Sequence, residues 1–298
     1  MMQVNSSQSR PADPPAEPGT NIPLILVTND DGIQSPGLRA LVQAVCDLGD
    51  VIVAAPCRQF SNAGRSHPPS PARDRVVYPE TLPIPCDRVR AYGLEGSPAQ
   101  SVLRALVELV PRQPDLVISG INYGENVGSG VTISGTVGAA LEAAAVGVPG
   151  LAVSLQTPHE FHYHPSDSVD FSVAAGFARR MARLVLAGRL PPDVDVLKVD
   201  VPDTATLDTP WRMTRVSRQR YYVPVRRAPA TASGSPELNY VVEIEWKTLE
   251  PDSDIYALAV DRVVSVSPLS IDLTSRVDRS ALAAELERRR NGHTQSRG

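Results

Sequence analysis

The chain has 298 residues, of which 42% are hydrophobic and 21% charged, a balance that is typical of a globular protein and excludes wholesale disorder. Its 29 Lys and Arg residues stand against 33 Asp and Glu residues, and the formal charge of −4 excludes the basic excess expected of a general binder of nucleic-acid polymers. No uninterrupted apolar run reaches the ~18 residues that span a bilayer, so we expect no membrane partner.

The N-terminal segment, residues 1–22, is polar and rich in proline. It lacks the basic stretch followed by an apolar stretch that marks a secretory signal, and it is predicted to be a flexible tail. The three cysteines, Cys46, Cys57 and Cys86, are odd in number and have no CxxC or zinc-like spacing. Idle thiols are typical of a reducing compartment, so we expect a cytoplasmic location.

At residue 23 the sequence changes from a polar, proline-rich segment to alternating apolar runs. Residues 23–28 form a short apolar run that ends in polar residues, the pattern of a strand buried on both faces. Residues 36–48 carry apolar side chains at helical spacing, and residues 50–56 form a second apolar strand. A strand, a helix and a strand within about 35 residues make a βαβ unit.

The same alternation continues along the chain. After short β-like runs at 76–92, helices are expected at 97–110, 134–147 and 168–187, and strands at 115–119, 148–154 and 194–200. Strands and helices that alternate in this way predict the α/β class, with a mostly parallel sheet covered by helices.

The pattern changes after residue 210. Residues 211–217 and 238–247 alternate polar and apolar side chains with period two, which predicts antiparallel strands. We expect a short apolar segment at 254–260, a further strand at 263–269, a charged terminal helix at 280–290, and an exposed hairpin tip in the Ala-, Pro- and Ser-rich segment 228–236.

Two adjacent carboxylates, Asp30 and Asp31, follow the first strand in the run Asn29-Asp-Asp-Gly32. Open α/β sheets bind their ligands at the carboxyl ends of the strands. Neighbouring carboxylates repel each other and need a partner to stay ionised, and Mg²⁺ or Mn²⁺ prefers such hard oxygen ligands. The pair therefore indicates a metal site, with a plain turn as the alternative because all four residues are turn formers.

The region after the third strand carries a second set of polar groups. Asn122 follows that strand by three residues and can offer an amide oxygen to a metal. Ser134, Gly135 and Thr136 begin a helix, where free N–H groups and two hydroxyls can bind a phosphate. A simple N-cap is the alternative role of this triplet.

The loop after the second strand adds a third set. Ser61 is a candidate for completing a metal shell, and Arg58 or Arg65 is a candidate partner for phosphate. Each of these residues alone is typical of a solvated loop. Because three strand-end loops carry oxygen ligands or anion donors, together they predict one site for a metal and a phosphate.

Three motifs follow one another in the first half of the chain: Val27-Thr-Asn-Asp-Asp-Gly-Ile-Gln-Ser-Pro-Gly37, Ala55-Pro-Cys-Arg-Gln-Phe-Ser61, and Ser119-Gly-Ile-Asn-Tyr-Gly-Glu-Asn-Val-Gly128 with Ser134-Gly-Thr-Val137. In this combination they resemble the SurE survival proteins, a family of metal-dependent 5′/3′-nucleotidases. The resemblance is dense over residues 24–156 and continues more weakly to residue 269.

The resemblance implies a role for each matching position. Residues that match the ligands of one divalent metal, Mg²⁺ or Mn²⁺, are Asp30, Asp31, Ser61 and Asn122. Residues that match the phosphate-holding positions are Asn126, Ser134, Gly135 and Thr136, and Arg58 is expected to bind substrate beside them. On this basis the expected catalytic residues are Asp30, Asp31 and Asn126.

The family fold implies a single domain over residues 23–298. Its Rossmann-like three-layer α/β core would cover about 23–210, and a β-hairpin and a helix, exchanged between subunits in the family, would cover about 211–298. A homodimer or homotetramer is therefore expected.

The sequence departs from the family pattern at residues 97–101, which lack the usual acidic residue, and at 129–133, where an acidic residue and a tyrosine are common.

The expected function is hydrolysis of nucleoside monophosphates, and the alternative is a nucleotide- or phosphate-binding protein with weak or lost turnover. A sugar-nucleotide transferase is a third reading, because Rossmann-like folds host many chemistries. The histidine-rich stretch 159–164 is either a second metal site or a solvated loop at the rim of the active site.

Overall fold

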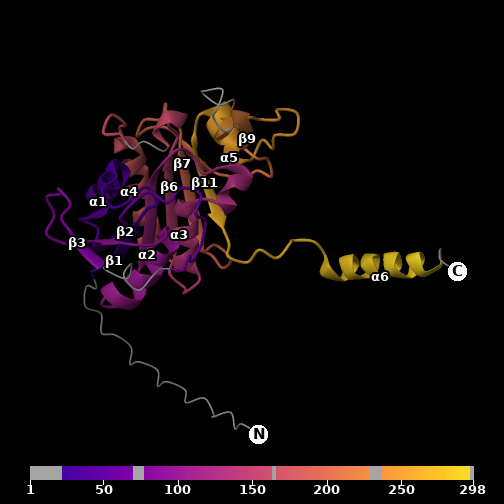
Figure 1. Cartoon of the computed structure of the whole chain (residues 1–298), viewed down its shortest axis with the longest axis horizontal. Coiled ribbons are helices and arrows are strands. Elements are labelled where there is room, and N and C mark those ends of the chain that lie inside the picture. The colour runs from indigo at the N-terminus through magenta and orange to yellow at the C-terminus, as the bar shows by residue number, and fades with distance from the viewer. Residues whose placement is uncertain (1–21, 70–76, 163–165, 228–236, 296–298) are drawn as a thin grey trace, which may run out of the picture.

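A nine-stranded sheet forms the centre of the computed structural model, which describes residues 22–69, 77–162, 166–227 and 237–295 (Figure 1). The order of the strands across the sheet is β3-β4-β2-β1-β5-β6-β7-β11-β8. The N-terminal tail up to residue 21 and the hairpin tip at 228–236 lie outside the described residues.

The strands within the described residues are β1 (Leu24–Thr28), β2 (Asp50–Pro56), β3 (Val77–Glu80), β4 (Val89–Leu94), β5 (Leu116–Tyr123), β6 (Gly150–Leu155), β7 (Val196–Val201), β8 (Trp211–Met213), β9 (Tyr222–Arg227), β10 (Glu237–Val242) and β11 (Val264–Leu269). The longer helices are α1 (Pro36–Val45), α2 (Pro98–Arg104), α3 (Gly135–Ala144), α4 (Ser172–Leu186) and α6 (Arg279–Gln295). Short helical segments are η2 (Ala105–Leu109), η3 (Gly128–Thr132), η4 (His159–Phe161), α5 (Asp254–Tyr256) and η5 (Ala257–Asp261).

Helices cover both faces of the sheet, so the predicted three-layer α/β core is confirmed (Figure 1). On β1, Ile25 and Val27 pack in the core cluster that holds α1 and α4. The alternate residues Leu24 and Leu26 pack in the cluster that holds α2 and α3. Because both faces of β1 are buried, its sequence is a continuous apolar run rather than an alternating one.

The predicted helices of the core are shorter in the structure than in the sequence pattern, whereas the charged terminal helix expected at 280–290 is longer and spans Arg279–Gln295. The helix expected at 168–187 begins only at Ser172, because the Asp170 carboxylate accepts the Ser172 N–H at 2.8 Å and fixes a turn there. The helix expected at 97–110 passes into the wider turn η2 and ends at Leu109, because Val110, directly before Pro111, is extended. A residue that precedes proline disfavours helical backbone angles.

The third predicted strand ends later than Ser119. β5 continues to Tyr123 through a bulge, since Ser119 pairs with Ala152 of β6 whereas Asn122 pairs with Ser154. Gly120 lies in this bulge with φ +137°, and a Cβ there would come within 2.3 Å of the Val153 carbonyl oxygen. Asn122 is therefore a strand residue, re-aimed by the bulge, and not a loop residue as its spacing had predicted.

The C-terminal part departs from the sequence expectation in two places. The antiparallel hairpin is confirmed as β9 and β10, but β10 ends at Val242 and residues 243–247 are not strand. The prediction of an antiparallel strand at 211–217 is wrong, since β8 spans only Trp211–Met213 and pairs with β11 in parallel, while β11 itself runs antiparallel to β7. The short apolar segment at 254–260 is helical, within α5 and η5.

The C-terminal helix α6 extends away from the body on an extended connection (Figure 1). In the part of the chain that the structure describes, none of the helices combines the length and the apolar character needed to span a membrane.

Candidate active site

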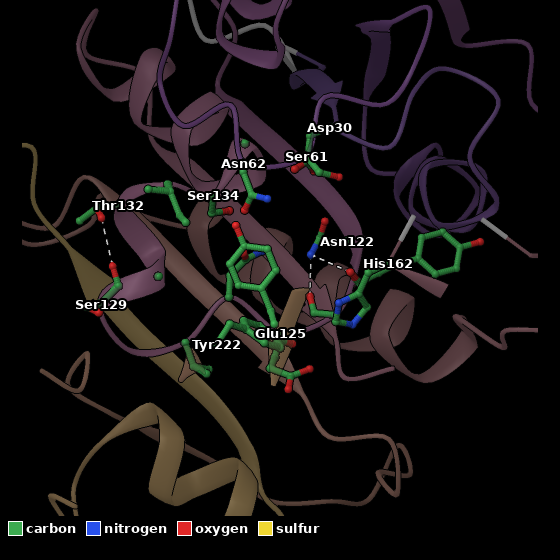
Figure 2. A pocket seen from close by; sticks show the side chains of 18 of the residues that line it. Asp30, Ser61, Asn62, Asn122, Glu125, Ser129, Thr132, Ser134, His162 and Tyr222 are labelled. Atoms are coloured by element: carbon green, nitrogen blue, oxygen red, sulfur yellow. Dashed lines mark hydrogen bonds between the residues drawn. The ribbon is translucent and has the colours of Figure 1, made fainter. Parts of the chain in front are cut away.

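The candidate site lies at the carboxyl ends of β1, β2 and β5. β2 is hydrogen-bonded to one side of β1 and β5 to the other, so the strand order reverses here. Such a reversal opens a crevice at the ends of the strands. A cavity of about 370 Å³ occupies this position, within the roughly 300–1,000 Å³ usual for small-molecule sites. Asp30, Ser61, Asn122 and Ser134 line it together (Figure 2).

Asp30 is a buried carboxylate with a fixed orientation. Its Oδ1 accepts a hydrogen bond of 2.6 Å from the Thr136 hydroxyl, and its backbone carbonyl accepts the Phe60 N–H at 2.7 Å. The absence of a side chain at Gly135 leaves room for it, because a Cβ there would lie 2.7 Å from Asp30 Oδ2. Burial raises the pKa of Asp30 to about 6.

Asp31 is held from two other directions. The Gln59 side-chain amide donates to Asp31 Oδ1 at 3.0 Å, and the Tyr123 N–H donates to Oδ2 at 3.4 Å. Burial and the adjacent charge of Asp30 raise the pKa of Asp31 well above its usual range. Among the described residues no cationic side chain forms an ion pair with either aspartate.

These properties fit a divalent cation. Two buried carboxylates without a cationic side chain need a positive charge to remain ionised, and both carry oxygen atoms of the kind that Mg²⁺ and Mn²⁺ prefer. The Asn122 amide nitrogen donates to the carbonyl oxygens of Tyr123 and Gly124 at 3.1 and 2.6 Å, so its amide oxygen is the atom left to coordinate. In the described residues no group of three His, Cys, Asp or Glu side chains could hold a metal ion, so a metal bound here would need neutral oxygens as its further ligands.

The N-terminus of α3 forms the neighbouring wall of the cavity. Ser134 caps the helix by accepting the Val137 N–H at 3.0 Å, and Gly135 is the first helical residue. The first amides of a helix have no partner inside it and attract anions. The N-cap role is therefore confirmed for Ser134, and its phosphate-binding role stays a prediction. The Thr136 hydroxyl is buried and bonded to Asp30.

Asn126 also lines the cavity, from the loop that follows β5. Its backbone N–H donates to Asp200 Oδ1 at 2.8 Å, and its side-chain amide donates to the Ser154 hydroxyl at 2.8 Å. Backbone and side chain are thus both fixed by residues of the sheet.

The two arginines considered from the sequence lie elsewhere. Arg58 is exposed, stacks over the Phe60 ring at 5.3 Å, and does not line the cavity. Arg65 donates to Glu142 of α3 at 2.6 Å. The arginine that lines the cavity is Arg220, which sequence reasoning missed because it lies in the C-terminal part, far from the motifs.

An aromatic wall faces the carboxylates, and sequence reasoning found it only in part. It consists of His159, His162, Tyr222 and Tyr240. The His162 ring packs edge-on against Tyr222 with centroids 5.7 Å apart, and Figure 2 shows both across the cavity from Asp30. Burial lowers the pKa of His162 to about 4, so its ring is neutral at pH 7. The sequence left the histidines as either a second metal site or a solvated loop at the rim, and it did not mark the two tyrosines as cavity residues. His164 lies outside the described residues.

The comparison with known proteins agrees with this geometry. Residues 25–223 match the family described as Survival protein SurE. The chain belongs to the SurE family. The 5′-nucleotidases SurE of Thermococcus gammatolerans and Thermococcus kodakarensis are 43% and 42% identical over 254 residues, which cover 85% of this chain and 92% and 95% of those proteins.

A solved structure supports the same assignment. The crystal structure of the SurE protein from Aquifex aeolicus matches with a TM-score of 0.67 at 30% identity, covering 85% of this chain and 95% of that one. The family resemblance and the Rossmann-like fold inferred from the sequence motifs are both confirmed.

Proposed function

We propose that this SurE-family chain is a metal-dependent 5′-nucleotidase that hydrolyses the phosphomonoester of nucleoside monophosphates. The observation that carries the proposal is that the buried Asp30 carboxylate and the N-terminus of α3 line one cavity, while the adjacent Asp31 is buried beside it without lining the cavity itself. The family's curated members named 5′-nucleotidase SurE support the reaction class.

The metal ligands would be Asp30, Asp31, Ser61 and Asn122, and the ion would be a single Mg²⁺ or Mn²⁺. Such a cation would polarise a phosphoryl oxygen and offset the charge of the carboxylates. The first amides of α3, with the Ser134 hydroxyl and Asn126, would bind the remaining phosphate oxygens. Phosphoryl transfer requires positioning and electrostatic stabilisation above all, and these groups would provide both.

A substrate panel tests the reaction. The full chain is assayed with 5′- and 3′-nucleoside monophosphates in the presence of Mg²⁺, Mn²⁺ or a chelator. We expect phosphate release that depends on the metal and is lost with the chelator. Nucleotide binding without turnover under every metal condition would contradict hydrolysis and favour a binding protein.

Metal binding has a signature that is independent of activity. Mn²⁺ at about 100 times its Kd is expected to stabilise the folded chain by about 2.7 kcal/mol, because a ligand that binds only the native state shifts the unfolding equilibrium. Thermal unfolding of the metal-free chain with and without Mn²⁺ measures this rise in Tm. The Asp30→Asn variant is the matched control, and an equal rise in that variant would place the metal elsewhere.

Assembly and location follow the family expectation: a homodimer or homotetramer in the cytoplasm. Support comes from apolar side chains of the C-terminal part that face solvent in a single chain, such as Leu273 at 90% exposure and Leu286 at 56%. Sedimentation equilibrium of the full chain is expected to give two or four copies. A monomer at micromolar concentration would contradict this assembly.

A further inference from the structure

Lys198 is one of two lysines in the chain and is fully buried in β7. Its ammonium group contacts the Asp200 carboxylate and lies 3.2 Å from Asp254 Oδ2, and all three side chains have 0% exposure. Burying such a cluster is costly, and apolar residues of the same size often stabilise a fold equally well. We therefore expect the cluster to have a role other than stabilising the fold.

Both carboxylates of the cluster hold the loop that follows β5. Asp200 Oδ1 accepts the Asn126 N–H at 2.8 Å, and Asp254 Oδ2 accepts the Gly128 N–H at 3.1 Å. Asp200 uses one oxygen for the lysine and the other for the loop amide, whereas Asp254 Oδ2 faces both the lysine and the Gly128 N–H. The loop residues between and beside these anchors line the cavity.

The side chain of Asn126 is fixed from the same part of the sheet. Ser154 of β6, whose hydroxyl accepts the Asn126 amide at 2.8 Å, is the register partner of Asp200 on β7. Two neighbouring sheet residues therefore hold the backbone and the side chain of one cavity residue.

The C-terminal part braces the loop from the other side. α5, which carries Asp254, lies beside β11 (Figure 1). The Ser217 N–H donates to Asp254 Oδ1 at 2.9 Å, and the Ser129 N–H donates to the Gln219 carbonyl at 2.8 Å. The cluster lies where the core, the loop that follows β5 and the C-terminal part meet.

We propose that the buried Lys198–Asp200–Asp254 cluster positions Asn126 for its contact with the substrate phosphate. None of the three residues lines the cavity, so they act as positioning residues and not as catalytic ones. The inference rests on the proposed function, in which Asn126 binds a phosphate oxygen.

The variant that tests this is Asp200→Asn, which preserves size. The carboxylate receives donors on both oxygens, from Lys198 and from the Asn126 N–H, whereas an amide offers a single acceptor oxygen. One of the two contacts must break. We expect a fall in kcat/KM of up to about 100-fold, since displacement of a positioning contact by about 1 Å costs that much, and the fall should lie in kcat more than in KM.

A double-mutant cycle separates positioning from a structural role. Asn126→Ala removes the side chain but retains the backbone N–H, so in that background Asp200→Asn should lower kcat/KM less than about 2-fold. Equal factors in both backgrounds, or no loss in either, would overturn the proposal. Asp254→Asn provides an independent second variant, and Ser265→Ala, buried on β11 and bonded to Thr214, is expected to leave kcat unchanged.

The cycle remains decisive if the wild-type chain turns over no nucleotide. In that case the proposed function fails, and the same four proteins are compared by calorimetry for the Kd of inorganic phosphate with Mn²⁺ present. Non-additive losses of affinity would support positioning, whereas additive losses or an absence of phosphate binding would overturn it.

Discussion

Replacing Asp30 by asparagine is expected to lower kcat/KM for a nucleoside monophosphate by about 1,000-fold, the equivalent of ~4 kcal/mol of transition-state stabilisation. Asp30 is buried, lines the cavity, and stands beside the N-terminus of α3. The amide retains the size of the carboxylate and can still accept the Thr136 hydroxyl, so the change removes charge and little else. Steady-state kinetics at saturating Mn²⁺ measures the loss.

The stability of this variant tests whether the loss of rate is chemical or comes from unfolding. The pKa of Asp30 in the fold, about 6, lies above its ordinary value, so ionisation costs stability. Below pH ~4 the carboxyl is protonated in both the folded and the unfolded chain, and the free energy of unfolding is not reduced. Above pH ~6 it is ionised in both, and the full reduction applies. In metal-free buffer at pH 7, Asp30→Asn should therefore unfold at the same Tm as the wild type or a higher one.

A matched aspartate controls for the removal of a charge. Asp167 is 85% exposed in its side chain and pairs with Arg39 on the surface, and Asp167→Asn is expected to retain wild-type kinetics. Wild-type turnover by Asp30→Asn, with its metal dependence intact, would refute the assignment of Asp30 as a ligand.

The meeting of three of the proposed metal ligands at one cavity could be predicted because it depends on local sequence and one topological rule. Asp30 follows β1 directly and Ser61 follows β2, and the carboxyl ends of parallel strands meet at one edge of the sheet. The sequence predicted the correct edge of the sheet for Asn122 but placed it in a loop, whereas it lies in β5. The bulge at Gly120 could not be predicted because it breaks the alternating pattern from which strands are predicted.

The aromatic wall and the buried cluster could not be predicted because they depend on long-range packing. Tyr222 lines the cavity and Asp254 holds the loop that follows β5, and both come from the C-terminal part, about a hundred residues beyond the motifs. Arg58 illustrates the converse: its position in a motif suggested a phosphate partner, whereas its packing on Phe60 keeps it out of the cavity. Residue type and spacing alone do not tell which side of a loop faces the ligand.

Replacing Gly135 by alanine is expected to lower kcat/KM by about 100-fold, because a Cβ at this position would lie 2.7 Å from Asp30 Oδ2 and 2.8 Å from Asp30 Cβ. Asp30 cannot give way easily, since its carbonyl is bonded to the Phe60 N–H and its carboxylate to Thr136. Displacing a ligand by about 1 Å costs two orders of magnitude in rate. Overpacking of this kind also costs about 1–3 kcal/mol of stability, so kinetics and thermal unfolding are measured together.

The comparison with a second glycine isolates the steric cause. Gly188 follows α4, and a Cβ there would meet no heavy atom within 4 Å. Gly188→Ala therefore adds the same methyl group in open space and is expected to retain wild-type kcat/KM. The Mn²⁺ affinity of Gly135→Ala, measured by titration of the metal-free chain, should fall in parallel with the rate. A Gly135→Ala chain with wild-type rate and wild-type Mn²⁺ affinity would show that the Asp30 carboxylate is free to move, and the rigid placement of the metal ligand beside the helix N-terminus would be disproved.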